Sequence, residues 1–421
     1  MSGNGQSLPR DELIRIIQRV EKGSFLDQEL DSYFSRSITD QSKKSLIYDI
    51  AAGVVRWRLY LEWLISLYVK KRTKKQLEIL LKIALYQLEF MRKPFYHVIN
   101  ETVSFAKSKW GDEIGNFVNA VLRNHMRTKD SLNPPNLSIK YSFPGWLVAR
   151  WEKRFKEETA TLLFCLNRPL RFGLRINTKL ISQKEAIDLL NRKGISVEKG
   201  KYLNYALYTK KLMPLLQDDL FKEGFIYVQD EASQLSVEAM NLAGGELVLD
   251  ACCGYGTKTR QILDLWGSRC KVVCIDKSRN KVKKVSDRAL RVVGDILALP
   301  FKQNLFDSIL LDAPCSSLGI IHKHPEIKWR VEEEDIQRLA EIQLSLLEAL
   351  WETLKPGGSL VYSVCSFEPE ETFWVIEKFQ KKLNAKLVRA LPFTEEPYFI
   401  SIPHKSGMDG FFIAKFKKIC A

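Results

Sequence analysis

Five short apolar runs decide the fold of the second half of the chain: ELVLDAC at 246–252, KVVCID at 271–276, RVVGD at 291–295, SILLDAPC at 308–315 and SLVYSVCS at 359–366. Helical stretches such as 336–354 separate most of these runs. Strands that are apolar on both faces and alternate with helices form a parallel sheet that is covered on both sides. The sequence therefore predicts an α/β domain at 236–421, with its chemistry at the carboxyl ends of the strands.

The preceding residues predict two further domains. An apolar stripe at helical spacing and few glycines indicate an all-α bundle at 1–130; the stripe comprises Leu77, Leu80, Leu81, Ala84, Leu85 and Leu88. Three prolines make 127–145 typical of a linker. Helix-like and strand-like pieces then alternate, so we predict that 131–235 holds this linker and a small α+β subdomain.

The charge balance points to a polyanionic partner. Lys and Arg number 65 against 50 Asp and Glu, which leaves a net charge of +15. Such a surplus favours nucleic acid or an anionic membrane surface, although a basic protein without such a partner has the same balance. The basic cluster at 70–75 is compatible with a solvated face or with phosphate binding.

Neither a membrane span nor a signal peptide is predicted, because no apolar stretch approaches ~18 residues and the N-terminus lacks an apolar segment. The eight cysteines are too sparse for a disulfide scaffold in a chain of 421 residues. They form no paired motif with zinc-ligand spacing, so no metal site is expected. We expect a cytoplasmic protein in a reducing compartment.

A glycine-containing loop, DACCGYGTKT at 250–259, follows the first run. Gly254 and Gly256 would let the backbone approach a ligand as the chain enters a helix. The loop lacks the third glycine of the dinucleotide fingerprint and the glycine before Lys-Thr of the P-loop, so neither NAD nor ATP is well supported. At the next two strand ends, Asp276 and Asp295 are placed to contact the ribose and the base of a nucleoside, or to cap the following helices.

Two cysteines end the fourth and fifth runs. Cys315 follows Asp312, and Cys365 ends the neighbouring strand. A single cysteine is usually a small buried apolar residue. Two cysteines at ligand-facing strand ends beside an aspartate instead favour a reactive site, in which the thiolate is the nucleophilic form.

These motifs resemble the RsmB (Sun, Fmu) family of S-adenosylmethionine-dependent RNA 5-methylcytosine methyltransferases over nearly the whole chain. The resemblance is carried by DAPCSSLG at 312–319, HPEIKW at 324–329, YSVCS at 362–366, DGFFIA at 409–414, RIN at 175–177 and QDEAS at 229–233. The helical segment resembles the family's NusB-like RNA-binding domain through YQ at 86–87, NE at 100–101 and FVNAVLR at 117–123. The family implies a Rossmann-like class I methyltransferase fold for the C-terminal domain.

The resemblance also implies the chemistry. The family transfers a methyl group to cytosine C5 in RNA, here 16S small-subunit ribosomal RNA, through a covalent cysteine adduct at C6. It assigns Cys365 as the nucleophile, Cys315 to proton loss and enzyme release, and Asp312 and Lys258 to the active site. The implied cofactor-binding residues are Asp250, Cys252, Gly254, Gly256, Lys258, Asp276, Asp295 and Asp312. The target cytosine must be single-stranded or flipped out, and we favour a monomer.

The first motif departs from the family pattern. Cys253, Gly254, Tyr255 and Thr257 stand where the family has Ala, Ala, Pro and Gly. A non-catalytic RNA-binding or ribosome assembly factor with a degenerate cofactor loop is therefore the alternative hypothesis. Action on DNA is a third, because DNA enzymes of this chemistry use a Pro-Cys nucleophile such as Cys315 would offer.

Overall fold

The computed structural model describes residues 8–37, 40–168, 171–210, 212–216 and 218–419. The chain forms two compact units. The first comprises Met1–Arg168 and Ile321–Arg330, and the second comprises Pro169–Ile320 and Val331–Ala421. Within the described ranges, no helix has both the length and the apolar character needed to cross a membrane.

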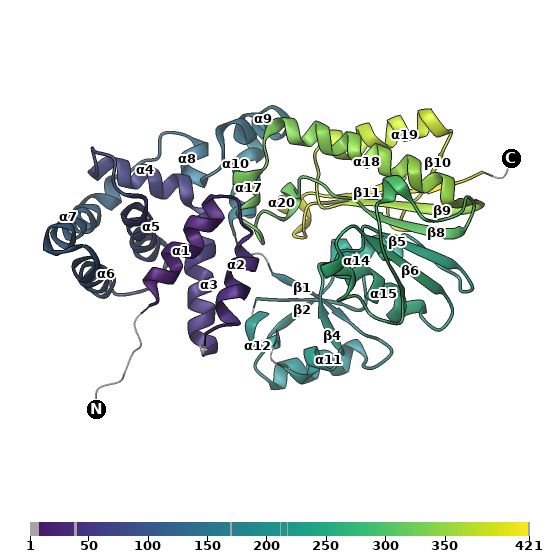
Figure 1. Cartoon of the computed structure of the whole chain (residues 1–421), viewed down its shortest axis with the longest axis horizontal. Coiled ribbons are helices and arrows are strands. Elements are labelled where there is room, and N and C mark those ends of the chain that lie inside the picture. The colour runs from purple at the N-terminus through teal and green to yellow at the C-terminus, as the bar shows by residue number, and fades with distance from the viewer. Residues whose placement is uncertain (1–7, 38–39, 169–170, 211, 217, 420–421) are drawn as a thin grey trace. The chain divides into compact units, whose positions relative to one another are not determined.

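The first unit is entirely helical over its described residues, which confirms the predicted all-α bundle (Figure 1). Its predicted apolar stripe lies on α5, where Leu80, Leu81 and Leu85 are fully buried in the core. The main helices are α1 (Arg10–Glu21), α2 (Leu26–Phe34), α3 (Gln41–Arg56), α4 (Arg58–Tyr68), α5 (Lys75–Phe90), α6 (Phe95–Trp110), α7 (Asp112–Thr128), α9 (Gly145–Phe155), α10 (Thr159–Asn167) and α17 (Ile327–Arg330).

The predicted linker at 127–145 carries structure of its own. It contains the short helices η1 (Lys129–Ser131) and α8 (Leu137–Tyr141). Phe143, between α8 and α9, is fully buried and packs edge-on against Trp151. The compact units and the predicted domain ranges therefore divide the chain at different residues, since α8, α9 and α10 belong to the first unit.

A segment from the second half of the chain, 321–330, completes the first unit. The buried Arg56 guanidinium donates a hydrogen bond to the His322 carbonyl oxygen at 2.9 Å. Trp329 Nε1 donates to the Val55 carbonyl oxygen at 2.7 Å. These bonds satisfy polar groups at the end of α3, and they join residues more than 260 positions apart in the sequence.

A buried lysine in this segment contacts α10 and the loop before α9. Lys328 Nζ donates to Asn167 Oδ1 at 3.1 Å and lies 3.8 Å from the centre of the Phe143 ring. Burial lowers the pKa of this lysine well below its ordinary value. The segment is thus held by specific polar contacts as well as by packing.

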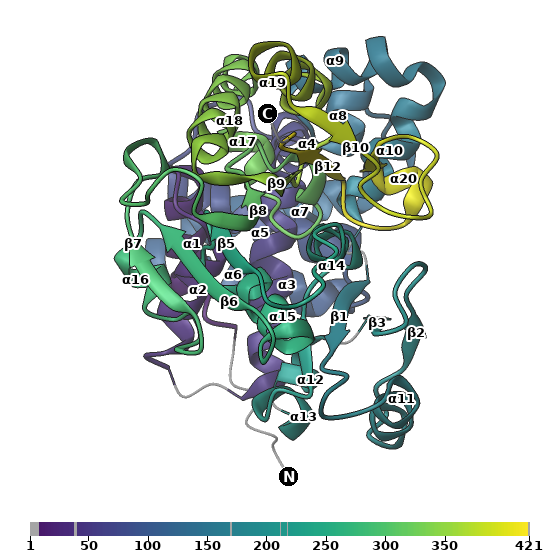
Figure 2. The same ribbon diagram turned by 90° about the vertical axis from the view of Figure 1, so that its right-hand side faces the viewer.

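The second unit begins with the predicted small α+β subdomain, labelled in Figure 2. Its antiparallel sheet has the strand order β2-β3-β1-β4. Leu174, Leu190 and Leu207 form part of its core, contributed by strands and by the helix α11. The elements are β1 (Phe172–Ile176), α11 (Gln183–Arg192), β2 (Val197–Lys199), β3 (Ala206–Thr209), α12 (Leu212–Leu216), α13 (Asp219–Lys222) and β4 (Ile226–Val228).

The five predicted runs form neighbouring parallel strands of the large sheet, with β12 antiparallel beside β9. The order is β10-β12-β9-β8-β5-β6-β7, and β11 pairs with β12. The strands are β5 (Leu247–Ala251), β6 (Lys271–Asp276), β7 (Leu290–Val293), β8 (Phe306–Asp312), β9 (Leu354–Val364), β10 (Lys386–Val388), β11 (Tyr398–Ser401) and β12 (Phe411–Lys417). The predicted α/β fold is confirmed.

Helices cover both faces of this sheet, as Figure 1 shows. Val248 packs on the side of α14 and α15, whereas its neighbour Leu249 packs on the side of α18 and α19. This alternation is the period of two expected of a strand buried on both faces. The helices are α14 (Glu231–Glu238), α15 (Thr257–Trp266), α16 (Arg279–Val282), α18 (Glu333–Thr353), α19 (Val375–Leu383) and α20 (Pro403–Ser406), with the shorter turns η3 (Ile296–Ala298), η4 (Leu318–Ile320) and η5 (Glu370–Trp374).

A buried ion pair joins the small sheet to α15, a helix that covers the large sheet. Arg175 of β1 lies 2.8 Å from Asp264 of α15, and both side chains are at most 5% exposed. Arg175 also donates to Gln229 at 2.9 Å. The RIN and QDEAS motifs therefore supply a structural connection inside the second unit.

Candidate active site

Two free thiols meet at the carboxyl edge of the large sheet. β8 and β9 are adjacent and parallel, with Asp312 opposite Ser363. Just beyond these residues, Cys315 Sγ and Cys365 Sγ lie 3.2 Å apart, and neither forms a disulfide. The strand pairing thus brings together two residues that are 50 positions apart in the sequence.

The backbone around the thiols is tightly packed. Ser317 adopts a left-handed conformation with φ of 59°, and its hydroxyl accepts a hydrogen bond from the Cys365 thiol at 3.3 Å. Gly319 N–H donates to the Cys365 carbonyl oxygen at 3.1 Å, and Gly410 N–H donates to the Gly319 carbonyl oxygen at 2.9 Å. A Cβ at position 319 would lie 2.0 Å from the Gly410 carbonyl oxygen, so only glycine fits there.

The two thiols have different environments. The pKa of the Cys315 thiol is raised well above its ordinary value by its hydrogen bond to Cys365 and by burial. A shared hydrogen bond of this kind favours a pair that carries at most one negative charge. Cys315 therefore holds its proton more tightly than an ordinary thiol does.

An ion pair lies beside the thiols. Lys258 Nζ is 2.6 Å from Asp312 Oδ2, and Ser363 donates to Asp312 Oδ1 at 3.0 Å. The Lys258 ammonium also lies 5.3 Å from the centre of the Phe411 ring. The carboxylate is therefore held in one orientation by a cation and a hydroxyl.

A buried carboxyl group supports the loop that carries Cys315. Glu371 accepts hydrogen bonds from the Ser316 N–H at 2.7 Å and from the Ser316 hydroxyl at 2.5 Å. Gln343 Nε2 donates to it at 3.1 Å, and Tyr362 donates to the Glu371 carbonyl oxygen at 2.6 Å. Burial raises the pKa of Glu371. This network fixes the backbone immediately after Cys315.

The glycine-containing loop turns over the end of β5. Gly254 N–H donates to Asp276 Oδ2 at 3.0 Å, and Ser278 N–H donates to Asp276 Oδ1 at 2.8 Å. Gly256, the N-cap of α15, has φ of 81°, and a Cβ there would lie 2.7 Å from Val285. Asp276 thus holds the loop while its remaining lone pairs stay available to a ligand.

Two other predicted carboxylates lie elsewhere. Asp250 is fully buried and accepts a hydrogen bond from the Thr259 hydroxyl at 2.5 Å, and burial raises its pKa to about 7. Asp295 caps η3 by accepting the Leu297 N–H, and it lies 3.1 Å from Lys277 Nζ. Both contacts hold local structure, and the predicted cofactor contacts of these two residues remain predictions.

A cavity of about 450 Å³ opens beside the loop and the ion pair. One part of its wall is formed by the loop, polar and charged residues Cys252, Gly254, Asp276, Lys277, Lys281 and Asp312. The aliphatic part of the wall includes Ile296, Leu297, Leu339, Ile342 and Leu346. Carboxylates suit ribose hydroxyls and an ammonium group, and the aliphatic wall suits an adenine ring. The described residues therefore fit S-adenosylmethionine.

The sequence analysis missed several contributors to this site. Ser317 and Ser363 contact the thiols and Asp312, and Phe411 faces Lys258. Glu371, which supports the loop bearing Cys315, lies five residues beyond YSVCS and outside the quoted motifs. Ser317, Ser363 and Phe411 lie within the quoted motifs, and that proximity was the available signal.

Comparison with known proteins identifies the family. The chain is 34% identical over 390 residues to the ribosomal RNA small subunit methyltransferase B of Vibrio cholerae, with 89% of each chain covered. The chain belongs to this methyltransferase family. A family model described as 16S rRNA methyltransferase RsmB/F matches residues 237–417. The probable ribosomal RNA small subunit methyltransferase B of Bacillus subtilis is 31% identical, over 91% of this chain and 92% of its own.

The other parts of this RsmB/F family member also match known models. The NusB family model matches residues 7–127, and a ferredoxin-like domain model of the same methyltransferases matches 143–215. The solved structure of PH0851 superposes with a TM-score of 0.81 at 25% identity, covering 98% of this chain and 99% of its own. The predicted family, fold and cofactor S-adenosylmethionine are confirmed.

Proposed function

We propose that this chain methylates C5 of a cytosine in small-subunit ribosomal RNA, with Cys365 as the covalent nucleophile. The observation that carries the proposal is the pair of free thiols 3.2 Å apart at the ends of β8 and β9. The names of the relatives support ribosomal RNA as the substrate. Cytosine C5 is a poor nucleophile while its ring is conjugated, and a covalent adduct divides the reaction into easier steps.

In the first step, the Cys365 thiolate forms a bond to cytosine C6. The electron pair of the C5–C6 double bond moves to C5, which becomes nucleophilic. When held in the cavity lined by Asp276 and Asp312, S-adenosylmethionine would supply an electrophilic methyl carbon. C5 would bond to that carbon as the donor sulfur leaves with the electron pair as a neutral thioether. Rigid strand ends suit this transfer because the reacting atoms must be close and in line.

In the second step, C5 loses its proton to a base, the double bond re-forms, and Cys365 leaves as a thiolate. Cys315 suits the role of base for a specific reason. The main cause of its raised pKa is the hydrogen bond to Cys365, and that bond is lost once the Cys365 sulfur is bonded to C6. The Cys315 thiol then gives its proton to solvent more readily, and the resulting thiolate accepts the C5 proton.

Asp312 and Lys258 suit a positioning role at the base. Addition at C6 raises the basicity of cytosine N3, and a protonated N3 donates a hydrogen bond to a carboxylate. Lys258, 2.6 Å from Asp312, holds that carboxylate in position. Because a stacked and paired cytosine cannot present C6 to a thiol, the target must be single-stranded or flipped out, which costs a few kcal/mol in a duplex.

Methyl transfer to protein-free small-subunit ribosomal RNA tests the proposal. Cys365→Ala should reduce incorporation of labelled methyl groups at least ~10³-fold, as expected for loss of a covalent nucleophile. Cys165→Ala, a free cysteine of the first unit, is the matched control and should retain activity. Cys315→Ala should accumulate an RNA–protein adduct that survives denaturant. Full activity of Cys365→Ala would remove the proposed nucleophile.

The alternative, a non-catalytic RNA-binding factor, makes a different prediction for the cofactor. Tyr255 in the altered loop is 56% exposed and packs beside Lys281 and Lys284. Gly254 and Gly256 still provide the loop's turn. Calorimetric titration with S-adenosylmethionine should therefore show saturable binding; none at millimolar cofactor would favour the alternative.

A further inference from the structure

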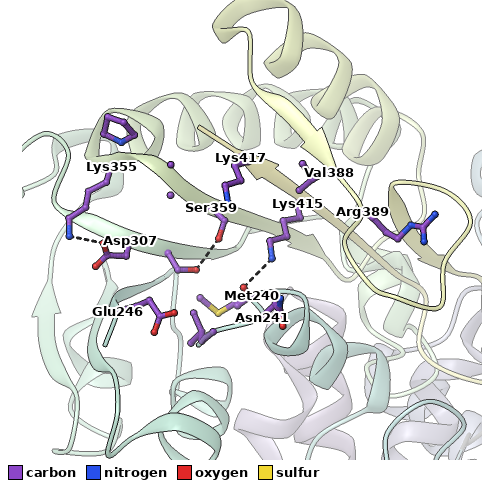
Figure 3. A pocket seen from close by; sticks show the side chains of 15 residues that line it. Met240, Asn241, Glu246, Asp307, Lys355, Ser359, Val388, Arg389, Lys415 and Lys417 are labelled. Carbon is purple, nitrogen blue, oxygen red and sulfur yellow. Dashed lines mark hydrogen bonds and ion pairs between the residues drawn. The ribbon is translucent and has the colours of Figure 1, made fainter. Parts of the chain in front are cut away.

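A second pocket lies at the opposite edge of the large sheet, near the amino ends of β8 and β9 (Figure 3). Its volume is about 500 Å³. It is bounded by the turn before β5, the start of β8, the turn at 355–359, and the ends of β10 and β12. We call it the amino-edge pocket. Along β9, Ser359 in this pocket is six residues from Cys365, or roughly 20 Å at about 3.3 Å per residue.

The acidic residues of the amino-edge pocket already have partners. Asp307 lies 2.6 Å from Lys355 Nζ. The two oxygens of Glu246 accept hydrogen bonds from the N–H groups of Ala243 and Gly244, each at 2.7 Å. These carboxylates therefore neutralise one lysine and cap one turn, and they leave the other cations of the pocket without acidic partners.

The remaining cations crowd together. Lys415 and Lys417 are two positions apart on β12, so their side chains project from the same face of the strand. Lys386 of β10 is not part of the pocket lining, but it lies directly opposite Lys417, an arrangement of like charges that destabilises a sheet. Arg389 extends from the rim (Figure 3). None of these four cations forms an ion pair with an acid in the described part of the chain.

Lys415 is the most enclosed of them. Its ammonium donates to the Met240 carbonyl oxygen at 3.1 Å, as the dashed line in Figure 3 shows. Burial and the neighbouring positive charge of Lys417 lower its pKa. The hydroxyls of Ser308 and Ser359, 3.4 Å apart, add donors on the pocket floor. A concave site with excess cations and hydroxyl donors fits an anion with several oxygens.

We propose that the amino-edge pocket binds backbone phosphates of the RNA substrate, at a distance from the methylated base. The proposal rests on the proposed function only in taking ribosomal RNA as the ligand. A span of roughly 20 Å is several times longer than one nucleotide step of about 3.4 Å, so the contacted phosphates lie outside the target nucleotide. Such contacts carry no sequence information and fix the position of the RNA.

Removal of three surface cations tests the proposal. The triple variant Lys386→Gln, Arg389→Gln and Lys417→Gln changes exposed side chains, so that folding should be preserved. Binding of protein-free small-subunit ribosomal RNA should weaken at least tenfold. The slope of log affinity against log salt concentration should become shallower by about 2–3, since each lost phosphate contact contributes about 0.7–0.9.

The matched control removes equal charge elsewhere in the second unit, through Lys283→Gln, Lys302→Gln and Lys381→Gln. All three residues are exposed and outside the pocket lining. The control should keep the wild-type slope; equal losses in both triple variants would overturn the proposal. Because this assay needs no methyl transfer, failure of the cytosine chemistry leaves it unaffected.

A second arm separates RNA from a small phosphate ligand. Inorganic phosphate and adenosine monophosphate are titrated calorimetrically into the wild type and the pocket variant. We expect no saturable binding of either probe below about 1 mM, because the isolated phosphate lacks the multiple contacts of a chain. Submillimolar phosphate binding that the pocket variant loses, together with unchanged RNA affinity, would overturn the proposed RNA contact.

Discussion

The strand β8 carries an Asp–Lys pair near each end, and the two pairs differ in their surroundings rather than in their geometry. Asp312 lies 2.6 Å from Lys258 at the carboxyl edge, and Asp307 lies 2.6 Å from Lys355 at the amino edge. Lys258 is 9% exposed, however, whereas Lys355 is 42% exposed. An exposed ion pair contributes little to stability. Loss of one partner from a buried pair is strongly destabilising, because it leaves a buried charge without compensation.

The neighbours of the two pairs differ in the same sense. At the carboxyl edge, a serine hydroxyl, an aromatic ring and two thiols surround the pair. At the amino edge, further cations stand without acidic partners. One edge thus has its groups held in fixed positions, as a chemical step requires, and the other has a surplus of positive charge, as binding of a polyanion requires.

The largest effect that distinguishes the two edges is expected for Asp312→Asn. The change leaves Lys258 without its partner and removes the carboxylate beside the base, so the rate of methyl transfer should fall about 10³-fold, equivalent to about 4 kcal/mol. RNA affinity and its salt dependence should remain those of the wild type. Single-turnover methylation and filter binding measure the two quantities.

Asp307→Asn is the matched control, because it breaks the other pair on the same strand. Methyl transfer should change less than about threefold, as expected for an exposed pair. If both variants lost activity equally, the two ion pairs would not differ in their contribution to methyl transfer.

A smaller effect is expected from the buried Asp250, below the carboxyl edge. Its pKa in the folded state is about 7, against 3.8 ordinarily. Because the folded state holds this proton more tightly than the unfolded state, stability is full at low pH and falls as pH rises toward 7. Asp250→Asn should remove about 2–3 kcal/mol of this decline between pH 5 and pH 8. Urea unfolding across that range measures it, and parallel curves for both proteins would contradict it.

Glu371→Gln should have a still smaller effect on catalysis. The amide keeps one acceptor for the Ser316 contacts but cannot match both of them, so the loop bearing Cys315 loosens. We expect about a tenfold loss in kcat with little change in KM for the RNA, and an altered pH profile, since Glu371 has a raised pKa. Glu370→Gln, its neighbour, serves as the control. A loss confined to KM would argue against a positioning role.

The smallest expected effect again concerns Asp307, now through RNA binding. Asp307→Asn releases Lys355 and adds one free cation to the amino-edge pocket. Affinity for ribosomal RNA should rise about twofold, and the salt dependence should steepen by up to about 0.7–0.9. Weaker binding by this variant would contradict the assignment of the pocket to RNA phosphates.

The sequence predicted the features of the fold that depend on local patterns. The strand runs, the helical stripe on α5 and the resemblance of DAPCSSLG and YSVCS all follow from neighbouring residues. The strand-end argument also anticipated that Cys315 and Cys365 lie near one another, although their catalytic roles stay predictions.

What the sequence could not predict depends on pairing between distant segments. Lys386 and Lys417 look unremarkable in the sequence, and only the antiparallel register of β10 and β12 sets them opposite each other. Asp250 and Asp276 both end strands, yet Asp250 is enclosed beneath the loop and Asp276 lines the cavity. Strand ends alone do not distinguish these environments.

The contribution of 321–330 to the first unit bears on how the protein is made. Arg56 and the Val55 carbonyl leave the ribosome about 270 residues before the stretch that holds His322 and Trp329. At about 5–20 residues per second, this is a delay of roughly 13–55 s. Until then their bonding partners do not exist. The N-terminal bundle, although translated first, can reach its final state only after synthesis has passed residue 330, about halfway through the methyltransferase region at 237–417.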